Sequence, residues 1–399
     1  MSSQPGLFKQ FIKEKPRTIA LGFILFCTVL ATFAYLFTGD KTPDINEQIT
    51  GIGLKKPGFA IDLVAIPKPQ DIPPTSFFNF LLNGRTNKYF FIPVDKYHIS
   101  QDSLTYYPYD GETPTSKVAP ITIHKAKWLL GDKAIQIAQH ENVYQITLED
   151  GNQVDLNRND VDQQLKKTGI QHRTFWLGTD LFGRSLLDRI ILGIRYSLFV
   201  GLLAVLISIT IGAVIGMVSG YFGGRTDDII SYIMNVFWSI PTLILVFAIV
   251  LVSGRGIQNI FIAVGLTMWV DTARLVRGQT LALKKEKYVE AVRSMGMSTA
   301  RILRKHILPN MLGPLIVIAV SNFASAIIVE SGLSYLGFGI QPPTPSLGSI
   351  LSENYGFILS NKPILAIAPV VVLLLLVLAF NLVGNGVRDI FDVKSNSQT

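Results

Sequence analysis

Residues 197–221 read SLFVGLLAVLISITIGAVIGMVSGY, a run of apolar and small residues with no charged side chain. At 1.5 Å per residue, a helix of this length measures about 37 Å, which is enough to cross the roughly 30 Å hydrocarbon core of a bilayer. A backbone surrounded by lipid must satisfy its own hydrogen bonds, so this run is expected to be a helix. The sequence therefore indicates a membrane-spanning chain.

Five more apolar runs raise the expected number of spans to six, and they cover residues 18–37, 229–252, 257–276, 311–332 and 364–384. Charged residues make up only 16% of the chain, whereas soluble domains contain about 25%. The first run follows a basic segment, as in a secretory signal, but its length and the lack of a small-residue cleavage site favour a retained span. Residues 183–194 are amphipathic at helical spacing and are expected to lie along the membrane surface.

Lysine and arginine gather in three places: before the first span, within residues 277–310, and in the tail after the last span. Short positively charged loops stay on the cytoplasmic side of a membrane, and six spans put all three segments on one side. We therefore expect a multi-pass protein of the inner membrane with both termini in the cytoplasm. These segments account for the basic character of the chain, and no nucleic acid partner is expected.

Residues 38–175 are polar and rich in Pro, Asn, Asp and Lys, with strand-like runs between turns. The clearest pattern is a hairpin of residues 143–148 and 153–156, for which Asp150 and Gly151 supply the turn. The topology places the segment outside, which is permitted because long loops cross a membrane largely regardless of charge. The expected fold is thus an all-α polytopic membrane protein with a mostly β extracytoplasmic insert between its first and second transmembrane helices.

The hydrophilic segment between the fourth and fifth spans ends in KYVEAVRSMGMSTARILRKHILPN, residues 287–310. Gly296 suits the left-handed position that ends a helix, Ser298 or Thr299 can cap a second helix, and Pro309 is expected to stop it. The pattern predicts two short helices joined by a tight turn.

One surface of this segment is small at Ala291 and carries a carboxylate at Glu290, which would suit close approach by another protein. A basic helix held at the membrane surface by anionic lipid explains the composition equally well. The residues alone leave both interpretations open.

Glu290-Ala291, Gly296 and Leu308-Pro309, at this spacing, resemble the EAA loop of permease subunits of binding-protein-dependent ABC importers. Val292 replaces the family's third alanine, and His306 replaces a branched residue. Further stretches are similar to the C-type subunits of the dipeptide and oligopeptide branch, namely WLGTDLFGRSLLDRIILGIRYSLFVG, GYFGGRTDD, ARLVRGQ, SYLGFGIQPPTPSLG and NLVGNGVRDIFD. The resemblance covers the first span and residues 176–392, but not residues 38–175.

The resemblance implies a permease subunit that moves peptides across the cytoplasmic membrane, and a loop that docks in a groove of a cytoplasmic ATPase. The implied coupling residues are Glu290, Ala291, Arg293, Gly296, Leu308 and Pro309. The implied partners are cytoplasmic ATP-binding subunits, a second permease subunit, an extracytoplasmic solute-binding protein and membrane lipid. The corresponding domains are residues 1–37 (N-terminus and first helix), 38–175 (insert), 176–392 (permease domain, with coupling loop 277–310) and 393–399 (tail).

No GxxxxGK[ST] loop for ATP phosphates occurs in the sequence, and neither does HExxH or GxSxG. The five histidines are scattered, so neither a metal site nor another cofactor is expected. The chain is therefore not expected to be an enzyme or to contain catalytic residues, and ATP hydrolysis is assigned to partner chains.

Charged residues inside the spans are costly and are expected to face the helix bundle or a water-filled path. Glu330 has two open roles, one in the translocation path or its gate, and one in fixing the loop that begins at Ser334. Asp271 and Arg274 are spaced for an i,i+3 pair, and Pro241 is expected to kink the third span.

Two other functions compete with peptide import. The same class of importer could carry nickel or another small solute, because these motifs report the ATPase contact rather than the cargo. A membrane-anchored receptor could instead act through the insert. Deleting residues 38–175 distinguishes the receptor, which would lose signalling, from the permease, which would keep transport. A secondary transporter is disfavoured because no relay of charged residues runs through the spans.

Overall fold

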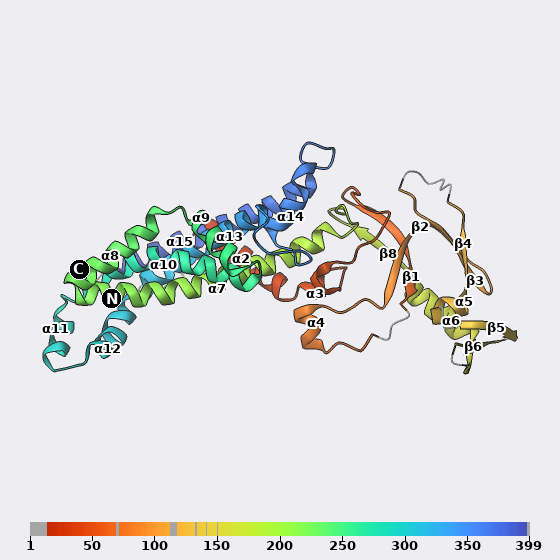
Figure 1. The fold of residues 1–399 in the computed structure, drawn as a ribbon, viewed down its shortest axis with the longest axis horizontal. Coiled ribbons are helices and arrows are strands. Elements are labelled where there is room, and N and C mark those ends of the chain that lie inside the picture. The colour runs from red at the N-terminus through yellow and green to blue at the C-terminus, as the bar shows by residue number, and fades with distance from the viewer. Residues whose placement is uncertain are drawn as a thin grey trace. The chain divides into compact units, whose positions relative to one another are not determined.

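The computed structural model describes residues 14–68, 72–111, 118–131, 134–140, 142–149 and 151–396. The chain divides into two compact units (Figure 1). The helical unit comprises Met1–Thr32, Gly193–Tyr355 and Ala366–Thr399, and the β-rich unit comprises Phe33–Leu192 and Gly356–Leu365.

Five described helices are long and apolar enough to cross a membrane, and a bent pair makes a sixth if its two helices count as one span. The five are α2 (Lys15–Thr32), α7 (Leu186–Phe222), α10 (Ile257–Leu283), α13 (Leu312–Tyr335, extending an apolar helix from Thr299) and α15 (Ile364–Asn396). Each expected span thus contains a helix or the bent pair. Large apolar side chains remain exposed along these helices, as expected where lipid is the solvent.

The third expected span is two helices rather than one. α8 (Gly224–Ser239) and α9 (Thr242–Ser253) meet at 91°. Ile240, which precedes Pro241, has extended backbone angles, because the proline ring disfavours a helical conformation in the residue before it. A kink was expected at Pro241, and the structure has there a bend of 91° that divides the span into two helices.

The expected surface helix over residues 183–194 is wrong, because α7 begins at Leu186 and continues without interruption to Phe222. The three charged side chains of that segment, Arg184, Asp188 and Arg189, are buried in polar contacts instead of facing water. Asp188 accepts hydrogen bonds from two backbone N–H groups, and Arg189 donates to the Asp180 carboxylate at 3.0 Å. In this segment, the amphipathic pattern therefore corresponds to a buried polar network at the start of a long helix.

The core of the helical unit lies where α7, α9, α10 and α13 meet. Its buried side chains are small or branched, and they include Val200, Ala204, Val246, Val250, Ala263, Val264 and Ala326. A short helix of this unit, α14 (Leu347–Asn354), packs on α13. α2 packs on α15 through Ala20, Ala379 and Val383.

The β-rich unit contains two antiparallel sheets. The larger has the strand order β4-β3-β2-β1-β8, with β1 (Phe59–Pro67), β2 (Tyr89–Ile99), β3 (Ser103–Pro108), β4 (Ile121–His124) and β8 (Ile170–Phe175). The smaller is β5-β6-β7, with β5 (Ala134–His140), β6 (Val143–Leu148) and β7 (Gln153–Asn157). The expected hairpin is confirmed by β6 and β7, and Gly151 at φ 79° makes its turn.

Among its described residues, this unit also contains the short α-helices α3 (Ala34–Phe37), α4 (Phe77–Asn83), α5 (Lys125–Leu130) and α6 (Arg158–Gln164). Trp128 of α5 is buried against the larger sheet and donates from its indole nitrogen to the Ala65 carbonyl at 2.7 Å. Its ring packs in a core with Val64, Val94 and Leu104. The unit therefore has a hydrophobic core of its own.

Candidate functional site

The hydrophilic segment after α10 forms a projection at one end of the helical unit, which Figure 1 shows at α11 and α12. α11 covers Lys287–Ser294 and α12 covers Thr299–Ile302. We call α11, α12 and the turn between them the elbow. The two short helices and the tight turn expected from the sequence are confirmed.

Gly296 makes this turn possible. Its φ of 78° lies in the left-handed region, where a residue with a Cβ is strained. Its N–H donates to the Arg293 carbonyl at 3.0 Å, and the N–H of Met297 donates to the Val292 carbonyl at 3.2 Å. This pair of bonds is the Schellman motif, which satisfies the last carbonyls of α11 and reverses the chain.

The inner side of the elbow packs against the long helices. Val289, Ile302 and Ile307 are buried, and they form one cluster with residues of α7, α10 and α13. The half-buried Val292 packs against the same cluster. A displacement of the elbow would therefore carry the ends of three long helices with it, because packed side chains transmit strain.

The outer side of the elbow carries most of the expected coupling residues. Glu290, Ala291, Arg293 and Gly296 are all exposed. The side chain of Met295 beside them is 83% exposed. The structure therefore brings these four positions to one exposed stretch of backbone, with an apolar side chain open to a partner.

The two remaining coupling positions lie at the return to the membrane. Leu308 is half-buried against the cluster below the elbow, whereas Pro309 is exposed. The prediction that Pro309 stops the second helix is wrong, because the chain winds on through π-helical residues Leu303–Ile307 and 3-10 residues Leu308–Met311 into α13. Proline lacks one N–H, and these altered turns accommodate the missing bond. Ser298 occupies the N-cap position but its side chain makes no capping bond.

Polar contacts brace both arms of the elbow. Asn310 donates to the Tyr288 hydroxyl at 3.1 Å and to the His306 carbonyl at 2.7 Å. Lys284 donates to the carbonyl of Gly220 at 2.8 Å, so its charge sits at the C-terminal end of α7, where a cation is favourable. Burial, together with the nearby Glu286 carboxylate, raises the pKa of the Tyr288 hydroxyl.

A bidentate ion pair next to the elbow was not foreseen from the sequence. Arg277 donates to both carboxylate oxygens of Asp227, at 2.5 and 2.6 Å, and Ser219 donates to the same carboxylate. The pair joins GYFGGRTDD to ARLVRGQ, two stretches that had been noted only for their resemblance to the family. Residues separated by 50 positions carry no spacing signal, so only the fold could bring them together.

A stripe of small residues on α7 was also missed, although its spacing is visible in the sequence. Gly212, Gly216 and Gly220 recur every four residues and face α10. A Cβ on Gly216 would lie 2.4 Å from the Ala273 carbonyl oxygen. Small residues at this spacing let two membrane helices approach to backbone contact, so the stripe fixes how α7 and α10 cross.

Comparison with known proteins identifies the family to which these features belong. Residues 212–396 match the family model described as "Binding-protein-dependent transport system inner membrane component". The oligopeptide transport system permease protein OppC of Bacillus subtilis is 38% identical over 55% of this chain and 72% of its own. The glutathione transport system permease protein GsiD of Pectobacterium atrosepticum is 40% identical over 56% of this chain and 73% of its own. The chain belongs to this family.

The dipeptide transport system permease protein DppC of Bacillus subtilis is a further similar protein, 41% identical over 55% of this chain and 68% of its own. Among solved structures, an inward-facing MetNI methionine ABC transporter chain is 23% identical, covers 51% of this chain and 97% of its own, and has a TM-score of 0.43. The protein is thus a permease subunit of an ABC importer and a multi-pass membrane protein. Its family consists of transport components rather than enzymes.

Within this permease, Glu330 is fully buried in α13. Its carboxylate accepts hydrogen bonds from the hydroxyls of Ser334 at 2.7 Å, Ser197 at 3.1 Å and Ser331 at 3.3 Å. The Ser334 hydroxyl in turn accepts from the backbone N–H of Ile340 at 3.1 Å. Glu330 therefore faces the helix bundle and contacts the start of the loop after α13.

A Glu330→Ala variant is expected to lose about 2 kcal/mol of stability, because three buried hydroxyls lose the hydrogen-bond acceptor that they share. Glu330→Gln is the matched control, since its amide oxygen still accepts and its volume is nearly unchanged. Thermal unfolding of the detergent-purified subunit, followed by size-exclusion chromatography, measures both. An alanine variant that unfolds at the wild-type temperature would show that these contacts contribute nothing.

The expected pair between Asp271 and Arg274 of the permease is wrong. Arg274 donates to the side chain of Asn235 on α8 at 2.8 Å, and its guanidinium lies 4.4 Å from the ring centroid of Trp238. Asp271 is exposed. Stacking and a hydrogen bond to a neighbouring helix thus replace the local i,i+3 contact, because a planar guanidinium can do both at once.

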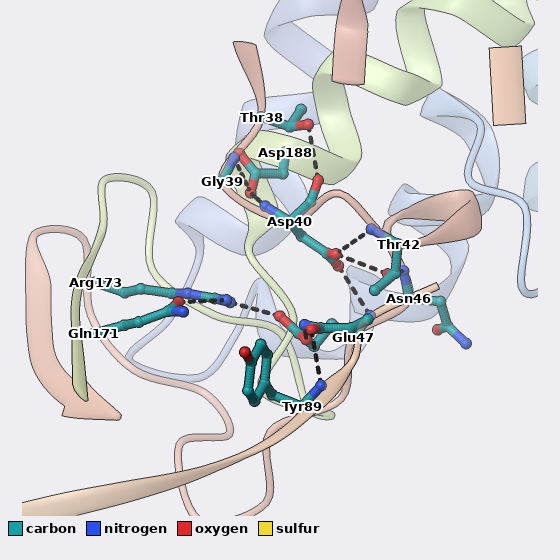
Figure 2. A network of polar contacts seen from close by, with 11 residues as sticks. Thr38, Gly39, Asp40, Thr42, Asn46, Glu47, Tyr89, Gln171, Arg173 and Asp188 are labelled. Atoms are coloured by element: carbon teal, nitrogen blue, oxygen red, sulfur yellow. Dashed lines mark hydrogen bonds and ion pairs between the residues drawn. The ribbon is translucent and has the colours of Figure 1, made fainter. Parts of the chain in front are cut away.

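The β-rich unit of the permease contains a second polar network, shown in Figure 2. Asp188 accepts hydrogen bonds from the backbone N–H groups of Gly39 and Asp40, both at 3.0 Å. The Asp40 carboxylate accepts from the N–H and hydroxyl of Thr42 at 2.7 Å and from the N–H of Glu47 at 2.9 Å. The chain that follows α3 is thereby tied to the start of α7.

A cavity of about 400 Å³ adjoins this network, and Asp40, Glu47, Arg173 and Trp176 are among its lining residues. Arg173 donates to Glu47 at 2.5 Å. Burial raises the pKa of the Glu47 carboxyl, while the Arg173 guanidinium acts in the opposite direction. Within the part of the chain that the structure describes, no group of three or more His, Cys, Asp or Glu side chains is placed to hold a metal ion.

Proposed function

We propose that this permease subunit forms part of the passage through which peptides are imported, and that its elbow transmits force from ATP hydrolysed on partner chains. The cargo is inferred from relatives named for the transport of oligopeptides, dipeptides and glutathione. Glutathione is itself a small peptide, so the three names share a substrate class. Nickel or another small solute is the alternative cargo for the same machinery.

The observation that carries the coupling proposal is the two-sided construction of the elbow. Its outer side exposes Glu290, Ala291 and Arg293, and its inner side is buried among residues of α7, α10 and α13. A partner bound to the outer side would contact the backbone at Ala291, where the side chain is small. It could also pair with the Glu290 carboxylate. Because the inner side is packed, movement of the partner would tilt the long helices.

We further propose that both termini and the elbow lie on the cytoplasmic side. Arg17 at the start of α2 forms an ion pair with Asp389 near the end of α15. Gly313, just beyond the elbow, lies against the Phe391 ring of α15. These contacts support placing the start of α2, the end of α15 and the elbow at one end of the helical unit. The basic residues at that end favour the cytoplasm.

The other segments of the chain and the other subunits would each have a separate role in transport. Residues 38–175 would form an extracytoplasmic insert, and residues 176–392 the permease domain. A second permease subunit would complete the path, and a solute-binding protein would deliver cargo from outside. Glu330 would act as a gate element through the loop that it anchors at Ser334, rather than through direct contact with the cargo.

A Glu290→Arg variant is expected to bind the ATP-binding subunits at least about tenfold more weakly, because reversing a charge at a contact costs more than about 1.4 kcal/mol. Co-purification of the ATPase with the tagged permease measures the loss. The matched control is Asp228→Arg, which makes the same charge change at an exposed residue of α8 outside the elbow. Wild-type recovery of the ATPase with Glu290→Arg would contradict the docking role.

The cargo is tested on the assembled importer in liposomes. ATP hydrolysis should rise when the solute-binding protein is loaded with short peptides, and it should not rise when nickel is supplied instead. Stimulation by nickel alone would replace peptides with the alternative cargo and leave the elbow proposal untouched.

A receptor acting through the insert is a second candidate, because the β-rich unit has its own core and a cavity of about 400 Å³. Deleting residues 38–175 separates the two functions. Continued uptake favours the permease, whereas loss of a cellular response with intact uptake favours a receptor.

A further inference from the structure

The short helix α4 (Phe77–Asn83) exposes more apolar surface than a helix on a water-facing domain should. Phe77 is 62% exposed, Phe78 is 76% exposed and Leu82 is 67% exposed. At 3.6 residues per turn these three side chains lie on one side of the helix. Large contiguous apolar patches on a folded domain mark an interaction site.

The other sides of α4 have different roles. Asn79 and Asn83 are exposed on the polar side and are joined by a side-chain hydrogen bond of 2.6 Å. The Phe80 ring points between the two sides toward Tyr35, with 6.2 Å between the ring centroids. α4 is thus an amphipathic helix that is held to its own unit by one face and leaves an apolar face uncovered.

The helix that holds α4 follows the first membrane span directly in the chain. Tyr35 belongs to α3, which begins two residues after α2 ends at Thr32. Just beyond α4, the N–H of Arg85 donates to the Lys41 carbonyl at 2.8 Å. α4 is therefore fixed beside the last turn of helix that follows the first span, within one unit of the structure.

The apolar surface of α4 has the same character as that of α3. Leu36 is 47% exposed and Phe37 is 60% exposed, so α3 also leaves large apolar side chains uncovered. α3 and α4 then share one kind of environment. Lipid is the occupant that this position favours, because the chain enters α3 directly from a membrane span.

Cations accompany this surface. The Lys41 ammonium donates to the carbonyls of Tyr35 at 2.6 Å and Leu36 at 3.0 Å at the end of α3. Arg85 is exposed, with its guanidinium 5.8 Å from the Phe80 ring centroid. Aromatic rings beside lysine and arginine are typical of the depth at which lipid headgroups meet acyl chains.

We propose that α4 is an interfacial membrane anchor, whose Phe77, Phe78 and Leu82 side chains enter the lipid beside the end of the first span. The insert would then be held against the membrane surface at α4 as well as through its two chain connections. This inference requires only that the chain spans a membrane and does not depend on the cargo or on the elbow.

Spin-label accessibility in the assembled importer tests the anchor. The chain has one cysteine, Cys27, so single labels are placed at Phe78→Cys and Leu82→Cys in a Cys27→Ala background. The assembly is reconstituted in bilayers of phosphatidylethanolamine and phosphatidylglycerol. Collisions with oxygen, which concentrates in lipid, are compared with collisions with a polar nickel chelate, which stays in water.

Labels at Phe78 and Leu82 should collide more with oxygen than with nickel. The matched control is Asn79→Cys on the polar side of the same helix, which should collide more with nickel. High nickel accessibility at Phe78 and Leu82 would overturn the anchor in favour of a water-exposed face. Immobile labels that neither reagent reaches would overturn it in favour of a protein partner. Two labelled positions guard against one variant that fails to fold.

Discussion

A Gly216→Leu variant is expected not to reach the native packing of its helical unit. On α7, a Cβ at this position would lie 2.4 Å from the carbonyl oxygen of Ala273 and 2.8 Å from the Cβ of Val276. Neither obstacle is the flexible end of a side chain, so α7 and α10 would have to move apart. Overpacking a core costs about 3 kcal/mol in severe cases, and occasionally more. That is a large part of the stability of an ordinary domain.

The loss of stability should exceed the cost of the clash at Gly216, because the crossing of α7 and α10 also positions polar groups. Ser208, one turn before the stripe, donates to the Met268 carbonyl at 2.9 Å. Asn322 of α13 donates to the hydroxyls of Ser208 and Thr272 at 3.3 and 3.2 Å. Separating the helices would leave these groups without partners in an apolar surrounding, where each unsatisfied group adds its own cost.

Folding yield of the full chain in detergent, measured by size-exclusion chromatography of a fluorescent fusion, checks this prediction. Gly22→Leu is the matched control, because Gly22 lies within the first span and a Cβ there would meet nothing within 4 Å. That control should fold as well as wild type or better, since leucine favours a helix over glycine. Equal, high yields for both variants would show that the close crossing of α7 and α10 is not needed.

The membrane helices were predictable because one physical rule decides them. Lipid offers no hydrogen bonds, so a long apolar run must be a helix wherever it lies. The rule says nothing of how a helix is interrupted or extended. It therefore did not predict that the bend at Pro241 reaches 91°, or that residues 186–194 are the first part of α7.

Contacts between distant parts of the chain were not predictable by spacing. Asp271 and Arg274 are three residues apart and do not pair, while Asp227 and Arg277 are 50 positions apart and make two hydrogen bonds. The sequence offers local candidates only, and the fold chooses among all partners that it brings near. The glycine stripe is the exception, since its four-residue period could have been noticed.

The elbow shows how much of a candidate site can be predicted from local sequence. Helix propensity and one glycine predicted its two helices and its turn, because a left-handed residue has few alternatives to glycine. Which side of α11 is buried could not be foreseen, since that depends on α7 and α13. Val292, which departs from the family alanine, turns out to face the packed cluster, so its added bulk lies away from the exposed side.

A Gly296→Val variant is expected to break the link between ATP hydrolysis and uptake. A Cβ at Gly296 would meet nothing within 4 Å, and φ is 78°, so the only cost is backbone strain. For a residue with a Cβ this strain is about 1–2 kcal/mol, which lowers the equilibrium constant for forming the tight turn about tenfold. The exposed surface of α11 would then no longer be presented to the ATPase in one fixed orientation. Gly296→Asn should be milder, because asparagine tolerates this region better than other residues.

Uptake per ATP hydrolysed, measured on the assembled importer in liposomes, separates coupling from stability. The matched control is Gly224→Val, which imposes similar strain at φ 51° with nothing within 4 Å of its Cβ, at the start of α8 and outside the elbow. That variant should lose some stability and keep the wild-type ratio. The ratio should fall several-fold for valine at Gly296 and less for asparagine. Wild-type uptake with valine at Gly296 would mean that force passes from the ATPase to the long helices by a route other than the elbow.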